Sequence, residues 1–275
     1  MALPAFSRYP LQAGSRDRAV GRSSSCVDWC ARGLSELSGL RVNAAKTLKQ
    51  IVSDAPRSAL RSAHRRWKLD RAIHRFVTRA SRGAIARECL ADLAYGWGNE
   101  AWSASPEFTE ACCREALFAR GPILECGSGL STILLGALTR GRGIEVHAFE
   151  HLEPWAARVR SELERLHLDH VHVHSAVLCD QGEFDWYQVP DRVAATCRFH
   201  LVICDGPPGD VHGGRYGLMP VMARQLAPGC VILLDDMERP AEQATLERWL
   251  ENWHLTWSLR DASTPFAHIR YERMA

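Results

Sequence analysis

Apolar and polar positions follow two alternating patterns along the second half of the chain, beginning near residue 122. Short apolar runs, typical of buried strands, are separated by stretches in which apolar residues recur at helical spacing. The predicted strands are 122–126, 144–150, 171–174, 199–204 and 230–234. The predicted helices are 131–140, 153–167, one that runs through Leu226 and ends near Pro228-Gly229, and 240–252. Strands that alternate with helices predict an α/β fold with a doubly wound, mostly parallel sheet.

The last residues of the chain differ from this alternation. Two apolar runs, 253–259 and 266–271, are separated by only six residues, 260–265. A parallel crossover needs about a dozen residues or more, so these two strands must be antiparallel. The prediction is therefore a seven-stranded sheet that ends in an antiparallel C-terminal hairpin.

The N-terminal part of the chain is basic and the rest is acidic. Residues 1–87 carry 18 Lys and Arg against 5 acids, and residues 88–275 carry 16 against 27. Residues 1–54 are predicted to be a largely disordered basic tail, because their start lacks apolar periodicity. An Arg- and Ser-rich start also suits an organellar transit peptide, which is the alternative.

Residues 55–120 are predicted to form an N-terminal helical region. Its first helix, 55–80, is amphipathic, with apolar residues on one face and arginines crowded on the others. Such a helix either packs on the acidic body with a solvated arginine face or contacts an anionic surface. Two further helices are predicted within 84–120, where Trp97 and Trp102 are either walls of a ligand site or ordinary core residues.

Composition limits the class of protein. Apolar residues make up 46 % of the chain, which is enough for a large core, and no apolar run approaches the ~18 residues of a membrane span. The ten cysteines show no paired Cys-x-x-Cys and several lie in apolar strands. This usage predicts a reducing, cytoplasmic location rather than a disulfide scaffold.

The most informative stretch is 123–132, where an apolar run ends in an acid and continues into Gly-x-Gly and the start of a helix. Gly127 and Gly129 permit a sharp turn and leave room for a ligand against the backbone. Ser131 or Thr132 is expected to cap the helix that follows. A second acid, Glu150, ends the next apolar run.

These residues resemble the Glu/Asp-x-Gly-x-Gly signature of class I S-adenosylmethionine-dependent methyltransferases. The Asp-Gly-Pro-Pro-Gly loop at 205–209 and the Leu-Leu-Asp-Asp strand end at 233–236 look like bacterial small-molecule O-methyltransferases, including the macrocin O-methyltransferase-like group. The resemblance covers about residues 95–272. It implies a Rossmann-like methyltransferase domain at 121–275, S-adenosylmethionine as the methyl donor, and a small-molecule or glycan hydroxyl as the acceptor.

The resemblance also implies a donor site. Glu125 would hold the methionyl ammonium, Glu150 the two ribose hydroxyls, and Asp205 would lie below the sulfonium. His151 would stack near the adenine, which residues 175–177 would border. The residues implied to bind the donor are Glu125, Gly127, Ser128, Gly129, Ser131, Thr132, Glu150, His151, Ala176 and Asp205.

A metal site is a further expectation. Asp205, Asp235 and Asp236 end two strands that are neighbours in this fold, and oxygen ligands of this number suit Mg²⁺. Without a cation, at least one of the three should keep its proton near neutrality. His212 or Asp210, on the following loop, is then a candidate proton acceptor beside Asp205. The alternative is that Asp235 or Asp236 caps the next helix.

Two other functions remain open at this point. One is a non-catalytic binding or scaffold protein on a methyltransferase fold, and the other is a nicotinamide-dependent oxidoreductase, which Thr132 disfavours because it replaces the third glycine of the dinucleotide pattern. No nucleic-acid-binding motif is present. His172 and His174 share one face of a predicted strand and are interpreted as polar strand residues rather than metal ligands.

Overall fold

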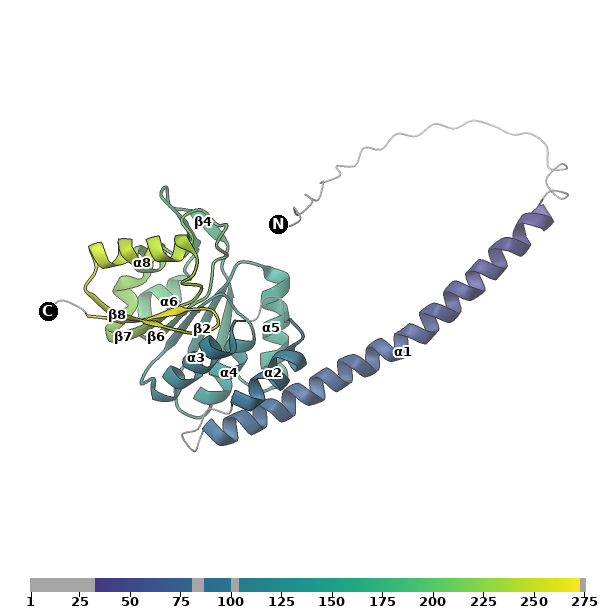
Figure 1. Cartoon of the computed structure of the whole chain (residues 1–275), viewed down its shortest axis with the longest axis horizontal. Coiled ribbons are helices and arrows are strands. Elements are labelled where there is room, and N and C mark those ends of the chain that lie inside the picture. Colours follow the sequence, from purple (N-terminus) through teal and green to yellow (C-terminus); the bar gives the residue numbers. More distant parts are fainter. Residues whose placement is uncertain (1–32, 81–86, 100–103, 273–275) are drawn as a thin grey trace. The chain divides into compact units, whose positions relative to one another are not determined.

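The computed structural model describes residues 33–80, 87–99 and 104–272, with side chains from residue 57 onward. Its main sheet has seven strands in the order β3-β2-β1-β6-β7-β9-β8 (Figure 1). These strands are β1 (Ile123–Cys126), β2 (Val146–Glu150), β3 (Val171–Ser175), β6 (Phe199–Cys204), β7 (Leu226–Leu234), β8 (Leu255–Arg260) and β9 (Phe266–Tyr271). The first five pair in parallel. The predicted doubly wound, mostly parallel sheet is confirmed.

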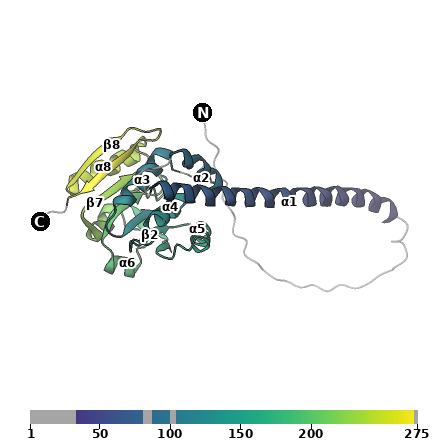
Figure 2. The same ribbon diagram turned by 90° about the horizontal axis from the view of Figure 1, so that it is seen from below.

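The C-terminal hairpin closes one edge of the sheet. Strand β9 pairs antiparallel with both β7 and β8, with Leu233 opposite His268 and Trp257 opposite Ile269. Figure 2 shows the hairpin at the edge of the sheet beside β7. The antiparallel direction follows from the short connection, as the sequence predicts.

Helices follow the strands, and the ones predicted at 131–140, 153–167 and 240–252 have bounds close to the predicted ones. They are α1 (Gly33–Ala80), α2 (Leu90–Trp97), α3 (Pro106–Phe118), α4 (Leu130–Thr139), α5 (Glu153–Arg165), α6 (Asp191–Thr196), α7 (Leu218–Met222) and α8 (Pro240–Asn252), with short 3₁₀ turns at η1 (Arg87–Cys89) and η3 (Ala223–Gln225). Proline lies in the first turn of α3, α5 and α8, where its missing N–H removes no helical bond. Among the described helices, none is long and apolar enough to cross a membrane.

The fifth parallel strand begins earlier than predicted. We expected a helix to reach Leu226 and the strand to begin at Cys230, but β7 already begins at Leu226. Leu226 pairs with Phe199, and the register then shifts before Leu201 pairs with Val231. Pro228 has no N–H to donate, so the ladder is irregular there without being broken.

The chain between β3 and β6 contains structure that the sequence pattern did not indicate. Strands β4 (Leu178–Asp180) and β5 (Asp185–Tyr187) form a separate two-stranded antiparallel sheet, and the single-turn helix α6 follows. Each strand is only three residues long, which is too short for a periodic apolar pattern to be recognised.

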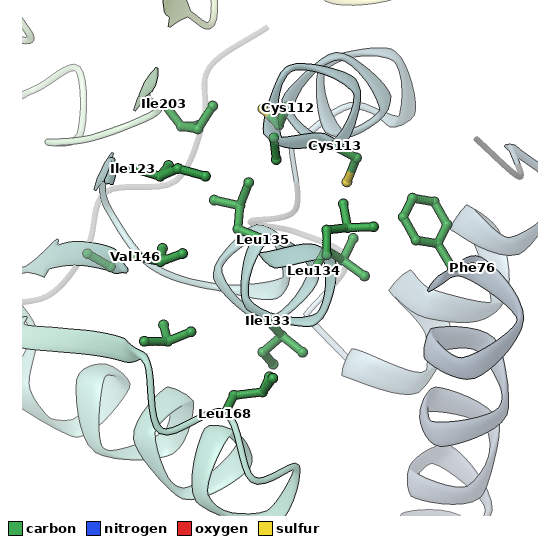
Figure 3. Packing of buried hydrophobic residues seen from close by; sticks show 14 of the residues in the cluster. Phe76, Cys112, Cys113, Ile123, Ile133, Leu134, Leu135, Val146, Leu168 and Ile203 are labelled. Atoms are coloured by element: carbon green, nitrogen blue, oxygen red, sulfur yellow. The ribbon is translucent and has the colours of Figure 1, made fainter. Parts of the chain in front are cut away.

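Two apolar cores lie on the two faces of the sheet. One contains residues of α1 to α5, and the other contains residues of the β4–β5 hairpin, α6, α7 and α8. In the first core, Leu134 and Leu135 of α4 lie between β1, α3 and Phe76 of α1 (Figure 3). Because successive residues of β1 point to opposite faces, Ile123 belongs to the first core and Leu124 to the second.

Helix α1 is longer than predicted. It begins at Gly33, so residues 33–54, expected in a disordered tail, are helical, and residues 1–32 lie outside the described part of the chain. The run 44–51 is rich in good helix formers such as Ala, Leu, Lys and Gln, which favours this extension. The chain divides into two compact units, residues 1–58 and 59–275.

Within the second unit, the end of α1 packs as a covered amphipathic helix. Leu69, Ile73 and Phe76 are buried in the first core, whereas Leu60 and Trp67 are 70 % and 52 % exposed. The apolar face of α1 is therefore covered over the last three turns of the helix. This agrees with the interpretation of a helix packed on the acidic body. The two residues nearer the start of the predicted face are not part of that core.

Candidate functional site

The predicted site residues converge at the carboxyl ends of the parallel strands. The chain runs from β1 outward to β2 and β3 on one side, and β6 lies on the other side of β1. The sheet therefore changes direction between β1 and β6, the place where open α/β sheets bind ligands. Cys126 at the end of β1 is paired with Phe149 on one side and Cys204 on the other, so the three strand ends are level.

Glu125 binds the start of helix α4 rather than open solvent. It is 2 % exposed, and its two carboxyl oxygens accept hydrogen bonds from Ser131 and Thr132, each at 2.5 Å. Burial raises the pKa of Glu125 to about 8. Both hydroxyls are thus directed at Glu125. The expected cap of α4 is also present, since Thr132 Oγ1 accepts from the N–H of the N-cap residue Gly129 at 2.8 Å.

The turn between β1 and α4 leaves space beside it. Gly127 has φ of +93°, a backbone conformation that favours glycine, and its N–H donates to Phe149 O at 2.9 Å. Gly129 has an extended φ of 171°, and a Cβ added there would meet no atom within 4 Å. A ligand can therefore approach the turn at Gly129, as the sequence predicts.

Glu150 lies at the end of β2, beside this turn. Its Oε2 accepts from Ser128 Oγ at 2.9 Å, and its Oε1 accepts from the Leu152 N–H at 2.9 Å. His151 Nδ1 lies 3.3 Å from Oε1, and the Ala176 N–H donates to the Glu150 carbonyl at 2.8 Å. Four predicted donor-site residues are therefore in one cluster. Each carboxylate oxygen has two lone pairs, so both can accept a further bond.

Only part of the expected adenine border, residues 175–177, lies at this cluster. Ala176 is buried next to Glu150, and Val177 is 55 % exposed. Ser175 is held away by side chains of α5, since its hydroxyl bonds Glu153 and accepts from Arg160 Nη1 at 3.0 Å. Its part in an adenine site stays a prediction.

Two aromatic residues near the turn were missed by sequence reasoning. Trp155 donates from Nε1 to the Ser128 carbonyl at 2.7 Å and so holds the turn from the side of α5. Tyr187 is 2 % exposed, and its hydroxyl is buried with no hydrogen-bond partner among the described residues. The Tyr187 hydroxyl lies 2.5 Å from the position that a Cβ on Gly206 would take, which places it against the loop after β6.

The three aspartates of the expected metal site do come together. One carboxylate oxygen from each of Asp205, Asp235 and Asp236 lies within 4.8 Å of the others. A residue that we did not predict lies among them. Arg215 is 2 % exposed, and its Nη2 contacts Asp236 Oδ2 at 2.6 Å and Asp205 Oδ1 at 3.3 Å.

Arg215 also binds the strand ends themselves. It donates from Nη1 to the Asp235 carbonyl and from Nη2 to the Asp205 carbonyl, both at 2.9 Å. Its Nε is 3.8 Å from the buried Glu242 of α8, while Arg239 Nη1 lies 2.9 Å from Asp236. The Gly-Gly-Arg-Tyr sequence at 213–216 held no signal that this arginine would be buried in a cluster of acids.

The cluster holds more carboxyl groups than guanidinium groups. Four carboxyl groups face two guanidinium groups, and Asp235 Oδ1 is buried without a hydrogen-bond partner among the described residues. Burial raises the pKa of Asp205 to about 6, although the charge of Arg215 opposes the change. Burial and repulsion from Asp205 raise the pKa of Asp235 to about 8. The pKa of Asp235 is therefore raised in the direction that the expectation of a retained proton requires.

The alternative, a helix cap by Asp235 or Asp236, is wrong. Helix α8 begins at Pro240 after Arg239, and neither Asp235 nor Asp236 caps it with a side chain. Asp236 instead contacts Arg215 Nη2 at 2.6 Å and Arg239 Nη1 at 2.9 Å.

The two candidate proton acceptors on the loop are exposed. Asp210 and His212 have no side-chain hydrogen bond or ion pair within the described part of the chain, and only the His212 carbonyl is bound, by the Asp185 N–H at 2.8 Å. Asp205, with a side chain 33 % exposed, is the predicted catalytic group that the structure places at the strand ends.

The other described aromatic candidates, Trp97, His172 and His174, pack against neighbouring rings. Trp97 is 5 % exposed and packs edge-to-face on Trp155, with ring centroids 5.8 Å apart, whereas Trp102 lies outside the described residues. His172 and His174 lie near His147 of β2, with ring centroids 5.1 and 5.4 Å from it. In the described ranges, three potential metal ligand atoms meet within 4.8 Å at the aspartates and not at these histidines.

Comparison with protein-family models and with curated proteins finds no match. Among solved structures, an O-methyltransferase from Bacillus cereus in complex with SAH is similar over 62% of this chain and 84% of that chain, with 19% identity and a TM-score of 0.46. The SAH-bound methyltransferase PaMTH1 from Podospora anserina covers 64% and 82%, with 17% identity and a TM-score of 0.48.

The O-methyltransferase TomG from Streptomyces achromogenes, involved in tomaymycin synthesis and solved with SAM, covers 62% of this chain and 82% of that chain. Its identity is 18% and its TM-score 0.45. At these identities and TM-scores, the likeness assigns neither a family nor a substrate to this chain.

Proposed function

We propose that this protein transfers a methyl group from S-adenosylmethionine to a hydroxyl of a small molecule or glycan. The observation that carries the proposal is the pairing of the open Gly127–Gly129 turn with Glu150, at the place where the sheet changes direction. A turn without a side chain leaves room for the methionine and ribose parts of the donor. A carboxylate with free lone pairs suits two ribose hydroxyls.

Two further features beside the turn suit a bound ligand. Tyr187 presents a buried hydroxyl without a partner among the described residues, which a polar ligand atom would satisfy. Ser128 and Trp155 hold the Glu150 side and the α5 side of the turn, so the site is already organised. Preorganisation lowers the cost of ordering the site when it binds.

S-adenosylmethionine would supply a methyl group on a sulfonium, which is already activated for transfer. The chain then has to hold the acceptor oxygen in line and accept its proton. Asp205 suits both the charge of the donor and the proton, because it is an acid at the strand ends whose pKa is raised to about 6. A general base works best when its pKa is close to the working pH.

Magnesium is a second part of the proposal. Asp205, Asp235 and Asp236 offer oxygen ligands of the kind that Mg²⁺ prefers, and the unpartnered Asp235 Oδ1 and the excess of acid over arginine fit a divalent cation. Bound there, Mg²⁺ would lower the pKa of an acceptor hydroxyl. Arg215 already neutralises part of this charge, so the metal and the arginine act on the same acids.

Three measurements test the function. They are donor binding by calorimetry, turnover with a labelled donor, and a mass-spectrometric screen for one added methyl. Binding with turnover supports it. Binding without turnover on any acceptor favours the scaffold alternative, and binding of NAD in place of S-adenosylmethionine favours the oxidoreductase.

The metal is tested separately by thermal unfolding. Added Mg²⁺ should raise the melting temperature of the wild-type protein but not of Asp236→Asn, because a ligand that binds only the folded state stabilises it. Full turnover in excess chelator, together with no shift on adding Mg²⁺, would remove the metal from the proposal.

A further inference from the structure

Arg215 and Glu242 lie close enough to attract each other but do not form a hydrogen bond. Arg215 Nε is 3.8 Å from Glu242 Oε1, and the two side chains are only 2 % and 1 % exposed. Within the described ranges, Arg215 Nε and both carboxyl oxygens of Glu242 have no hydrogen-bond partner. A buried polar atom without such a partner costs free energy, so this contact between the loop and α8 is incomplete.

The terminal nitrogens of the same guanidinium are fully used at the strand ends. Arg215 Nη2 lies 2.6 Å from Asp236 Oδ2 and 3.3 Å from Asp205 Oδ1. Nη1 donates to the Asp235 carbonyl and Nη2 to the Asp205 carbonyl, both at 2.9 Å. These contacts hold the guanidinium at the strand ends, short of hydrogen-bond distance from Glu242.

The aspartates that Arg215 contacts are also the ligands of the proposed magnesium site. One carboxylate oxygen from each of Asp205, Asp235 and Asp236 lies within 4.8 Å of the others, and the guanidinium contacts two of these three carboxylates. Two positive groups in so small a buried space repel each other strongly. Arg215 and a divalent cation therefore compete for the same acids.

Glu242 offers the guanidinium a second position. A shift of about 1 Å would bring Arg215 Nε to the usual hydrogen-bond distance from Glu242 Oε1 and would satisfy the unpartnered atoms of both residues. Such a shift is unfavourable while the aspartates have no other cation, because Asp236 would lose its closest basic partner. A cation at the aspartates removes that cost.

We propose that Arg215 and a divalent cation exchange at Asp205, Asp235 and Asp236, and that Glu242 receives the guanidinium when the cation binds. The exchange depends on the magnesium site of the proposed function, and it sets how tightly the chain binds the cation. Without the metal, Arg215 compensates the acids at the strand ends. With the metal, Arg215 pairs with Glu242, so neither state contains an uncompensated buried guanidinium.

Calorimetry with MgCl₂ on the full chain, at one pH and one ionic strength, measures the competition. Arg215→Met should bind Mg²⁺ about tenfold more tightly than the wild type, the usual size of one charge-assisted contact. The matched control is Arg224→Met, which removes an exposed arginine of η3 and should change the dissociation constant less than about twofold. Mg²⁺ should also raise the melting temperature of Arg215→Met by more than that of the wild type.

A double-mutant cycle with Glu242→Gln tests the second position of the guanidinium. When Arg215 is present, Glu242→Gln should weaken Mg²⁺ binding about tenfold, because the displaced guanidinium loses its carboxylate partner. In Arg215→Met, the same substitution should change the dissociation constant less than about twofold, since no guanidinium has to be placed. The amide has nearly the shape of the carboxyl group, and the melting curve of each variant is the folding control.

The possible failures are distinguishable. Equal Mg²⁺ affinity of the wild type and Arg215→Met would overturn the exchange and leave the magnesium site in place. Equal losses from Glu242→Gln in both backgrounds would overturn the role of Glu242, because they would show direct attraction between its charge and the cation.

No binding by either the wild type or a folded Arg215→Met protein at about 10 mM Mg²⁺ would remove the metal from the proposed function, and the exchange with it. If Arg215→Met is unfolded without metal, folding on addition of Mg²⁺ supports the exchange, because the cation then replaces the arginine at the acids. A variant that stays unfolded at about 10 mM Mg²⁺ would overturn it.

Discussion

At the scale of single residues, Glu150 illustrates how a largely enclosed site acid is oriented by uncharged partners. Its oxygens are held by the Ser128 hydroxyl and the Leu152 N–H, and neither contact introduces a charge. The carboxylate is therefore oriented but not neutralised by a basic partner other than His151 at 3.3 Å. An oriented carboxylate can accept ligand hydroxyls without first breaking an ion pair.

Glu150→Ala should weaken S-adenosylmethionine about tenfold or more in calorimetry. Hydrogen bonds to a charged group are worth about 1.5–3 kcal/mol, and about 1.4 kcal/mol is a factor of ten. Glu164→Ala, which removes an exposed acid of α5, is the control and should bind normally. An unchanged dissociation constant in Glu150→Ala would exclude Glu150 from the site.

Gly129→Val should abolish donor binding and leave stability nearly unchanged. The extended backbone at Gly129 accepts any residue, and the added side chain would enter open space that the ligand needs. Gly127→Val is less informative, because φ of +93° strains a side chain there. Normal binding by a folded Gly129→Val protein would place the donor elsewhere.

At the scale of elements, Arg215 joins β6, β7 and α8 through one side chain. Arg215→Met should lower the free energy of unfolding by about 3–5 kcal/mol, since it leaves buried acids without their partner. Urea unfolding measures the change, with Arg224→Met as a control at an exposed position of η3. A loss no larger than that of the control would mean that the acids are neutral or otherwise compensated.

Glu125 should make stability depend on pH through the β1–α4 connection. Its pKa is raised from 4.5 to about 8 in the folded protein, so the folded state binds more protons than the unfolded state between these values. The free energy of unfolding should therefore fall as pH rises through this window.

Glu125→Gln should reduce that fall by about 1 kcal/mol or more, because the amide does not ionise. Urea unfolding at about pH 5 and about pH 8 provides the comparison. Equal pH dependence in the variant and the wild type would show that Glu125 is ionised throughout.

At the scale of the whole molecule, the donor-site residues all lie within the second compact unit, residues 59–275. Deleting residues 1–54 should therefore leave the affinity for S-adenosylmethionine within about twofold, a change below 0.5 kcal/mol or so. Calorimetry on the truncated protein checks this, with its melting curve as the folding control. A folded truncation that loses the donor would make the N-terminal segment part of the site.

The sequence by itself determined the alternating strands and helices, the antiparallel hairpin and the position of the glycine turn. These features depend on local pattern and connection length, which a chain carries wherever it folds. It also predicted that Asp205, Asp235 and Asp236 would meet, because carboxyl ends of neighbouring parallel strands share one edge. It did not predict the three-residue strands of the β4–β5 hairpin, nor the early start of β7 at Leu226, which pairs with the distant Phe199.

Only the tertiary structure decided what neutralises and surrounds the site. Arg215, Tyr187 and Trp155 reach the strand ends from a loop, a short hairpin and a helix, and nothing in their local sequence distinguishes them from surface or core residues. The hydroxyls of Ser131 and Thr132 also donate to Glu125, a contact that the sequence did not predict, while Thr132 Oγ1 accepts from the Gly129 N–H at the helix cap, as expected. Charge compensation and burial depend on residues far apart in the chain, so they are set only when the elements pack.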